Sequence, residues 1–364
     1  ITLNTSNDEI AVCNLGSINI PNHLDAEGNL DKEKLEKNVT TAIRMLDNVI
    51  DINYYAVPQA ENSNFKHRPI GMGIMGFQDA LYIKKIPYAS EAAVDFADES
   101  MELVSYMAIN ASSDLAKERG SYSSYEGSLW SQGILPLDSI EILEKQRGKD
   151  FIEVDKTTRL NWDVLREKVK TQGMRNSNTM AIAPTATIAN ITGLTQSIEP
   201  TYSNLFVKSN LSGEFTVINM HLVDALKEID MWDEVMVYDL KNLNGSLESI
   251  ARVPEDIKKL FATSFEVEPK WLIEAASRRQ KWIDQSQSLN LYVSEPNGKK
   301  LDVMYRMAWL RGLKTTYYLR SRSATTTEKS TITNMELNAV KTEPKTYDQP
   351  EACSIDDPDC EACQ

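Results

Sequence analysis

The sequence has few cysteines, few histidines and no long apolar run. Four cysteines in 364 residues exclude a secreted fold built on disulfides and favour a reducing compartment, which predicts a cytoplasmic protein. No apolar run approaches the roughly 20 residues of a membrane-spanning helix, and no signal peptide is visible. A net charge of −14 argues against nonspecific binding of nucleic-acid polymers. Because Ile1 is not a start methionine, we expect a processed piece, an expression fragment or half of an interrupted protein.

Three of the four cysteines lie close to the C-terminus, and Cys360 and Cys363 form a Cys-x-x-Cys pair. No core surrounds a chain end, so both sulfurs should be exposed and mobile. Adjacent thiols of this kind suit thiol–disulfide exchange, in which one sulfur attacks and its neighbour resolves the mixed disulfide. Zinc would need four ligands. Cys353 offers a third, but the histidines, at positions 23, 67 and 221, are scattered, so we favour a redox role and predict no metal site.

The segment Ser321–Asp359 is rich in Ser, Thr, Glu, Lys and Pro, and its only aromatic residue is Tyr347. Such a composition cannot bury enough apolar surface to offset chain entropy. A flexible coil from Tyr318 to Cys360 would have an end-to-end distance of about 35–40 Å. The sequence therefore predicts a folded unit over residues 1–320 and a flexible redox tail over residues 321–364.

Apolar periodicity predicts alternating strands and helices in the folded unit. Residues 9–20 are predicted to form a buried strand that carries Cys13, and residues 69–77 form a glycine-punctuated apolar run. Strands are also predicted over 178–183, 203–208, 214–218 and 314–320. Helices are predicted over 31–52, from Ser90 to Gly120, near 139–145, over 161–172 and 301–311, and starting near 219, 254 and 268. This alternation indicates an α/β architecture with largely parallel strands.

Three places in the folded unit have candidate chemistry. The turn Pro184-Thr185-Ala186-Thr187-Ile188 follows an apolar strand and leads into a short helix, whose free N–H groups could bind phosphate. A helix start capped by threonine explains the same residues equally well. Tyr317 and Tyr318 are adjacent on a predicted strand, where alternation would place one inward and one outward and ordinary aromatic packing is the simpler interpretation. Cys13, by default a small buried hydrophobe, gains interest because an exchange-competent tail needs a disulfide to reduce.

Taken together, these residues resemble the large subunit family of ribonucleotide reductases. The resemblance begins with the family signature, in which WDVL at 162–165 is followed by GMRN at 173–176 and MAIAP at 180–184. Further matches lie at 11–18 (AVCNLGSI), 68–73 (RPIGMG), 197–200 (SIEP), 212–215 (SGEF) and 283–286 (IDQS), and at the tyrosine pair and the terminal cysteines. Ordered matches from about Glu9 to Gln364 make the resemblance specific.

The resemblance implies a ten-stranded α/β barrel of two five-strand halves, of which this chain resembles the second half, with five parallel strands and surrounding helices, and the tail. The thiyl-radical cysteine, its neighbouring Asn and Glu, the first redox cysteine and the allosteric nucleotide sites should precede Ile1. The chain should therefore reduce ribonucleoside diphosphates to 2′-deoxyribonucleoside diphosphates only together with a missing N-terminal half.

The resemblance also implies roles for single residues. Cys13 and its missing partner would supply two electrons and become a disulfide, which Cys360 and Cys363 would then reduce. Tyr317 and Tyr318 would relay a radical. The turn from Pro184 to Ile188 would hold substrate phosphates, through the main chain at Ile188, where relatives often have Ser or Thr.

The tyrosine pair favours a class I enzyme, because the other classes need no relay to a second subunit, and the terminal sequence resembles class Ia more than Ib. No cofactor is expected in this chain. A radical or metal cofactor would reside in a separate small subunit, and thioredoxin or glutaredoxin would be the reductant. A second large subunit would complete a dimer. Two alternatives are a catalytically inactive assembly module that binds the small subunit, and an unrelated dithiol oxidoreductase, which would need a thioredoxin-like motif that the sequence lacks.

Overall fold

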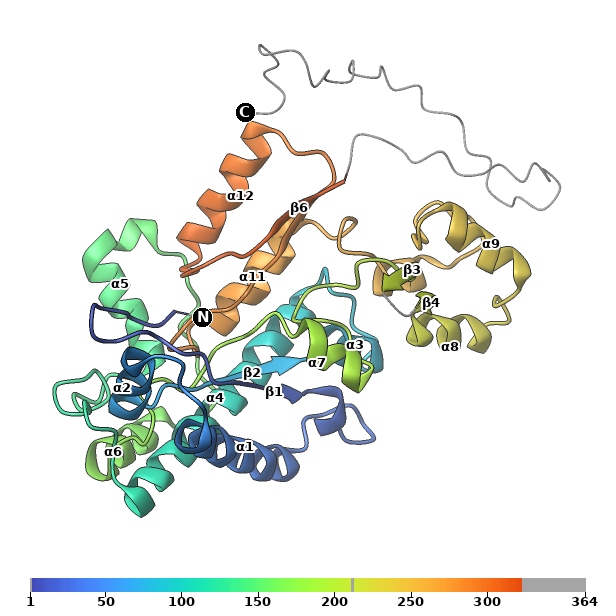
Figure 1. Cartoon of the computed structure of the whole chain (residues 1–364). Coiled ribbons are helices and arrows are strands. Elements are labelled where there is room, and N and C mark those ends of the chain that lie inside the picture. Colours follow the sequence, from blue (N-terminus) through green and yellow to red (C-terminus); the bar gives the residue numbers. More distant parts are fainter. Residues whose placement is uncertain (1, 211–212, 323–364) are drawn as a thin grey trace, which may run out of the picture.

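A computed structural model describes residues 2–210 and 213–322, apart from the side chains of residues 208–210. Cys353, Cys360, Cys363 and nearly all of the predicted tail lie outside the described residues. Helices and strands are mixed along the described chain, but they do not alternate regularly as predicted, because several helices follow one another between some of the strands (Figure 1). The helices are α1 (Lys32–Ile52), α2 (Pro58–His67), α3 (Phe77–Ile83), α4 (Glu91–Arg119), α5 (Ser139–Arg147), α6 (Trp162–Gln172), α7 (Ala186–Thr192), α8 (Met220–Glu228), α9 (Glu234–Asn242), α10 (Glu255–Leu260), α11 (Pro269–Gln280) and α12 (Gly298–Leu310). The strands are β1 (Leu15–Asn19), β2 (Gly71–Met75), β3 (Leu205–Asn210), β4 (Gly213–Ile218), β5 (Leu291–Val293) and β6 (Leu319–Ser321).

Parallel extended segments form the centre of the molecule. β1 pairs in parallel with β2, and β5 pairs in parallel with β6. Between these pairs lie residues 178–183, which are extended and form isolated parallel bridges to Met72 and Gln287 rather than a regular strand. The amide of Met72 donates to Thr179 at 2.7 Å, and that of Ile182 donates to Ser286 at 3.1 Å. The prediction of largely parallel strands is confirmed, but the described residues form no closed sheet, so the ten-stranded barrel is not confirmed.

Two glycines explain how β2 fits between its neighbours. A Cβ on Gly73 would lie 2.5 Å from the carbonyl oxygen of Ala181, and one on Gly71 would lie 2.7 Å from a methyl carbon of Leu15. Real Cβ atoms do not approach other atoms so closely, so only glycine permits this spacing of the backbones. The glycine punctuation of the apolar run at 69–77 therefore reflects close packing between parallel segments.

Side-chain caps fix the starts of the long helices. Asp31 accepts from the amide of Lys34 at the start of α1, and Ser90 accepts from the amide of Ala93 at the start of α4. Asn161 caps α6 in the same way. These contacts satisfy amides that have no partner within the helix. The predicted helix boundaries are confirmed at these positions to within a residue.

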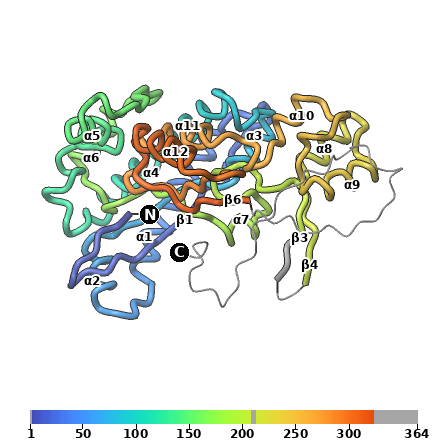
Figure 2. Tube along the Cα trace, turned by 90° about the horizontal axis from the view of Figure 1, so that it is seen from above, coloured from blue at the N-terminus to red at the C-terminus, as the bar shows by residue number. Residues whose placement is uncertain are grey.

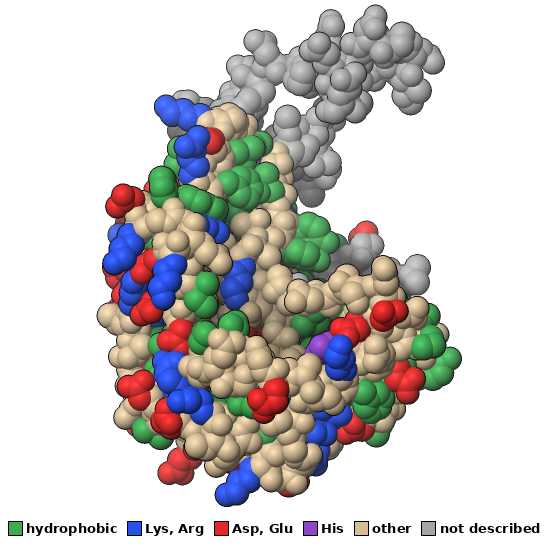
Figure 3. Space-filling view, turned by 90° about the vertical axis from the view of Figure 1, so that its left-hand side faces the viewer, with side chains coloured by type: hydrophobic (Ala, Val, Ile, Leu, Met, Phe, Trp, Pro, Cys, Tyr) green, Lys and Arg blue, Asp and Glu red, His purple; other side chains and the backbone are tan. Residues whose placement is uncertain are grey.

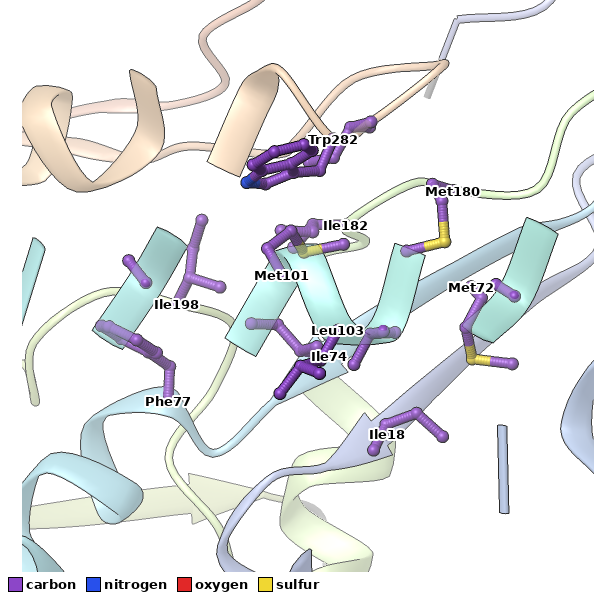
Figure 4. Close-up of a cluster of buried hydrophobic side chains, with 14 of the residues drawn as sticks. Ile18, Met72, Ile74, Phe77, Met101, Leu103, Met180, Ile182, Ile198 and Trp282 are labelled. Carbon is purple, nitrogen blue, oxygen red and sulfur yellow. The ribbon is translucent and has the colours of Figure 1, made fainter. Parts of the chain in front are cut away.

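The main hydrophobic core fills the space between the parallel segments and helices α1, α4 and α11. Figure 4 shows Ile18 of β1, Met72 and Ile74 of β2, and Met180 and Ile182 of the 178–183 segment in one cluster with side chains of α4. All of these side chains are buried. Their burial on both sides of the parallel run is typical of α/β proteins, whose helices cover the sheet.

A second, smaller core lies in the unit formed by α8, α9 and α10. Tyr82 of α3 joins this core and stacks on Phe261, with ring centroids 4.8 Å apart. The antiparallel hairpin β3–β4, predicted from its Ser-Gly turn, projects from this unit (Figure 2). Phe206, Val207, Phe215 and Val217 of the hairpin are exposed.

Two sequence predictions about strands are wrong in detail. The strand expected over 9–20 begins only at Leu15, and the strand expected over 314–320 begins only at Leu319.

Helix α12 exposes the apolar side chains of Val303, Tyr305 and Trp309. Figure 3 shows apolar side chains gathered in the upper part of the molecule, where α12 lies in Figure 1. No helix among the described residues has the length and apolar character needed to cross a membrane.

Candidate functional site

Tyr317 and Tyr318, here called the tyrosine pair, lie directly before β6 with their rings together. The ring centroids are 4.1 Å apart, and the two hydroxyls are hydrogen-bonded at 3.4 Å. Both side chains are about half exposed, at 47% and 53%. The expectation that one ring points inward and the other outward is therefore wrong, because the residues precede the regular strand in which alternation applies. The bond with Tyr318 raises the pKa of Tyr317.

The backbone of the tyrosine pair is fixed to the neighbouring segment. The amide of Tyr317 donates to Leu289 at 2.7 Å, and the amide of Leu291 donates to the carbonyl of Tyr318 at 2.9 Å. The side-chain oxygen of Asn290 accepts from the amide of Tyr318 at 3.2 Å. The backbone is thus fixed, while both rings stay about half exposed and the guanidinium of Arg320 lies 5.3 Å from the centroid of the Tyr318 ring.

Lys314 anchors the start of the segment that carries the tyrosine pair. Its ammonium group donates to the carbonyl oxygens of Ile283, Asp284 and Gln285 at distances of 3.1, 2.8 and 2.8 Å. Burial lowers the pKa of Lys314. The anchor ties the tyrosine segment to the IDQS motif at 283–286, whose Asp284 carboxylate accepts from the amides of Thr179 and Met180. In the sequence this motif stood out only as a family match, with no role attached to it.

Cys13 is exposed and lies two residues before β1. The prediction of a cysteine buried in a strand is therefore wrong. The next residue, Asn14, is buried, and its carbonyl accepts from the amide of Gly71 at 2.8 Å, while its side chain donates to Pro69. Cys13 thus sits on a well-anchored backbone with its sulfur accessible, and it is the only cysteine among the described residues.

Residues Pro184–Ile188, here called the α7 turn, follow the extended segment 178–183 and open α7. Thr185 lies at the N-cap with φ of 53°, and its side chain makes no cap hydrogen bond. Its hydroxyl instead accepts from the amide of Ser197 at 2.7 Å. A helix start capped by the threonine side chain is therefore not what the structure contains. The residues that follow Thr185 in the turn are exposed, and they stand at the carboxyl end of a parallel segment, where α/β folds bind ligands.

Glu199 is a buried acid to which the sequence alone assigned no role. Its carboxylate accepts from the amide of Asn290 at 2.8 Å. Burial raises the pKa of Glu199 to about 7, although the charge of Arg279 and the contacts with Asn290 oppose the rise. Its position in the SIEP motif was the available signal, but burial depends on a segment distant in sequence.

The signature residues at 162–165 and 173–176 build the scaffold beneath these groups. Trp162 stacks on Trp282, with centroids 5.1 Å apart and planes 10° apart. Arg175 pairs with the buried Asp47 at 3.2 Å, and the Asn176 side chain donates to the carbonyl of Arg68. These contacts connect α1 and α6 to the segments that enter the parallel run.

No group of three or more potential metal ligands is assembled within residues 2–210 and 213–322. The three histidines have separate surroundings. His23 contacts Asn38, His67 contacts Glu9, and His221 lies 3.5 Å from Asp79.

Comparison with known proteins identifies the family. The family model described as "Ribonucleotide reductase, barrel domain" matches residues 1–319. The chain belongs to the ribonucleotide reductase family. The ribonucleoside-diphosphate reductase subunit alpha of Chlamydia muridarum is 59% identical over 332 residues, which cover 91% of this chain and 32% of that protein. The corresponding subunit of Chlamydia trachomatis is 54% identical across the whole chain, which covers 36% of that protein.

A more distant relative, the ribonucleoside-diphosphate reductase large subunit of Danio rerio, is 39% identical over 334 residues, or 92% of this chain and 41% of that protein. The chain thus spans roughly a third of the length of the first curated relatives that it matches. In the described part of this ribonucleotide reductase barrel domain, β1 pairs only with β2 and β6 only with β5, so the parallel run has an open edge on each side.

Proposed function

We propose that this chain forms the C-terminal part of the large subunit of a class I ribonucleoside-diphosphate reductase, most similar to class Ia. It would act in reducing ribonucleoside diphosphates to 2′-deoxyribonucleoside diphosphates. Membership of the family supports the reaction class. The observation that carries the proposal for this chain is the tyrosine pair, whose hydroxyls are hydrogen-bonded at 3.4 Å.

The tyrosine pair is proposed to relay a radical between the small subunit and the substrate site. The hydrogen bond between the hydroxyls offers a route by which an electron and a proton can pass together from one tyrosine to the other. Half-exposed rings on a backbone fixed by Leu289, Asn290 and Leu291 suit this task, because the rings are accessible and the spacing is held. Ordinary aromatic packing would favour burial of the rings, whereas both rings of the pair are half exposed.

Cys13 is proposed to act as one of two reducing thiols. Removing the 2′-hydroxyl as water requires two electrons and two protons. Oxidation of Cys13 and a second thiol to a disulfide releases both. The exposed sulfur of Cys13 is available to a partner from outside the described residues, provided that the two Cα atoms come within about 7 Å. Cys360 and Cys363 would then reduce the disulfide by exchange.

The α7 turn is proposed to hold the substrate diphosphate through its backbone amides. The exposure of the turn and its place at the carboxyl end of a parallel segment support this role. The left-handed conformation of Thr185 turns its hydroxyl toward Ser197, so that the threonine side chain fixes the loop rather than the ligand.

The remaining partners follow from the incomplete barrel and from the relay. The open edges of the parallel run present unpaired backbone groups that another polypeptide can cover, and we propose the N-terminal half of the large subunit as that polypeptide. A small subunit would hold the radical or metal cofactor, a second large subunit would form a dimer, and thioredoxin or glutaredoxin in the cytoplasm would re-reduce the tail.

The alternative is an inactive assembly module that binds the small subunit without chemistry. It requires neither Cys13 nor the contact between the two tyrosine hydroxyls, and their presence argues against it.

Reconstitution tests the proposal. This chain is mixed with the N-terminal half, the small subunit, thioredoxin with its reductase, and a nucleoside diphosphate, and deoxynucleotide is measured. We expect turnover in the full mixture and none when either this chain or the N-terminal half is omitted. Normal turnover without this chain would establish the assembly module instead.

A further inference from the structure

Buried hydrogen bonds connect the tyrosine pair to the loop that follows α7. Asn290 accepts from the amide of Tyr318 through its side-chain oxygen at 3.2 Å. The backbone amide of the same Asn290 donates to Glu199 at 2.8 Å. Glu199 and Asn290 are both buried, so the bond between them is shielded from solvent, while the bond to Tyr318 is partly buried. Asn290 therefore holds Tyr318 with its side chain while Glu199 holds Asn290.

The loop that carries Glu199 is fixed to the α7 turn by a hydrogen bond between two residues with strained backbones. The amide of Ser197 donates to the hydroxyl of Thr185 at 2.7 Å, and both residues have left-handed backbones, with φ of 55° and 53°. Non-glycine residues adopt this conformation at a cost of about 1–3 kcal/mol each, and it persists only where the surroundings enforce it. Such strain concentrates at sites that must keep a fixed geometry.

The surroundings of Glu199 keep its carboxyl group in place. The fully buried Arg279 side chain supplies positive charge, which favours the ionised carboxylate. Arg279 is itself held by a 3.3 Å bond to Gln287 and by the face of Phe77, 4.9 Å away. These surroundings hold the carboxyl group of Glu199 in a fixed position.

We propose that Glu199 and Asn290 are positioning residues that hold the tyrosine pair in register with the α7 turn. The inference rests on the proposed function of both the turn and the pair. Thr185 is hydrogen-bonded to Ser197, and the short loop from Ser197 carries Glu199. Glu199 in turn holds Asn290, whose side chain holds the backbone of Tyr318. The same set of contacts then positions both the nucleotide bound at the turn and the tyrosine rings. Binding of nucleotide at the turn therefore changes the environment of the rings.

Fluorine NMR of the assembled reductase tests this coupling. The complex contains the full large subunit, the small subunit and 3-fluorotyrosine at position 318, and the ¹⁹F signal is recorded with and without cytidine diphosphate. We expect the nucleotide to shift the signal in the parent complex and in Glu199→Gln, which keeps an oxygen acceptor for Asn290. The shift should be lost in Glu199→Ala and in Asn290→Ala.

Nucleotide affinity and kinetics separate positioning from general damage. In Asn290→Ala the dissociation constant of cytidine diphosphate should change by no more than about threefold, while kcat falls and KM is nearly unchanged, because the ring moves and the turn does not. Asn290→Leu, which keeps the side-chain volume and removes the acceptor, replaces Asn290→Ala if that variant does not fold. Ser264→Ala is the matched control, since the Ser264 hydroxyl donates to the carbonyl of Pro200 at 3.2 Å, a buried contact that involves neither Thr185, Glu199 nor Asn290, and it should keep the ¹⁹F shift.

The outcomes distinguish this inference from the function on which it rests. A parent complex that neither binds nor reduces cytidine diphosphate overturns the proposed function, and the inference with it. A parent complex that is active, whose ¹⁹F shift survives in Asn290→Ala and Glu199→Ala, overturns the inference alone. Loss of the shift in Ser264→Ala as well would assign the effect to loop stability and also overturn it.

Discussion

The guanidinium of Arg68 lies 2.7 Å from the carboxylate of Asp47, which is completely buried in α1. Arg119 and Arg175 approach the same carboxylate at 3.1 and 3.2 Å. One acid thus joins the end of α2, the end of α4 and the signature loop to α1. Loss of this carboxylate would leave the three guanidinium groups without a shared partner.

Replacing Asp47 by Ala should lower the free energy of unfolding by about 3–5 kcal/mol, because removing one partner of a buried ion pair strands the others. Asp51→Ala is the control. Asp51 also pairs with Arg68, but 44% of its side chain is exposed, and exposed pairs contribute about 0–1 kcal/mol. Chemical denaturation measures both, and equal losses would refute a special role for the buried acid.

Replacing either tyrosine of the pair by phenylalanine should abolish turnover of the assembled reductase and leave the fold intact. The rings are half exposed and make their backbone contacts regardless of the hydroxyl. The free energy of unfolding should therefore change by less than about 0.5 kcal/mol. Tyr54→Phe, at another exposed tyrosine, should retain turnover. Retained turnover in the pair variants would return the pair to ordinary aromatic packing.

Converting Cys360 and Cys363 to serine should permit one round of reduction and block the next. The pre-reduced thiols that include Cys13 can act once, after which their disulfide needs the tail. Rapid quenching should record a single-turnover burst with thioredoxin, and a small dithiol should restore repeated turnover. Cys13→Ser should not be restored in this way, because it removes the electron donor itself. Normal cycling of the tail variant with thioredoxin alone would exclude a shuttle.

Gly73→Ala should destabilise the protein by about 1–3 kcal/mol, because its Cβ would meet the Ala181 carbonyl at 2.5 Å. Gly298 begins α12, and a methyl group at that position would have no other atom within 4 Å and no left-handed φ to oppose it. Gly298→Ala should therefore be neutral or stabilise by about 0.4–1 kcal/mol. Thermal unfolding compares the two, and a neutral Gly73→Ala would mean that the parallel segments can separate without loss.

Glu199 gives stability a specific dependence on pH. Its pKa is about 7 in the folded chain against 4.5 for the ordinary group, because burial disfavours its charge. The folded state therefore keeps a proton that the unfolded state releases. The stabilisation is complete below about pH 4.5 and is lost as pH rises through about 7, a change of about 3 kcal/mol.

Glu199→Gln cannot titrate, so the difference between the unfolding free energies of the parent and the variant should follow that curve. Arg279, Tyr88 and Tyr292 also interact electrostatically with Glu199 and are unchanged in the comparison. Denaturation of both proteins between pH 4 and 8, in roughly one-unit steps, measures the difference. Parallel curves would show that Glu199 does not hold its proton in the folded state.

Local signals made the helices predictable. Asp31, Ser90 and Asn161 precede apolar periodic segments and cap the helices they announce, because a cap acts within a few residues of sequence. The glycines at 71 and 73 showed in the sequence only as punctuation of an apolar run, and the close approach that they permit is apparent only in the structure.

Long-range contacts were not predictable in the same way. The apolar run around Cys13 looked like one buried strand, but only the part from Leu15 finds a partner in β2. The tyrosine pair was assigned strand alternation, which requires a ladder that starts only after it. Glu199 gave no sign of burial, because its partner Asn290 lies on a segment 91 residues away in sequence.

The separation between Ile182 and Ser286 has a consequence for how the protein folds. Their hydrogen bond joins neighbouring parallel segments across about 100 residues of chain, and loops of that length close late because their ends seldom meet. The hairpin and the helices α8 to α10 have local contacts and their own core, so they can form before this closure. Asn290 and the tyrosines come into place only afterwards, and we expect a folding intermediate that is already compact but lacks the relay.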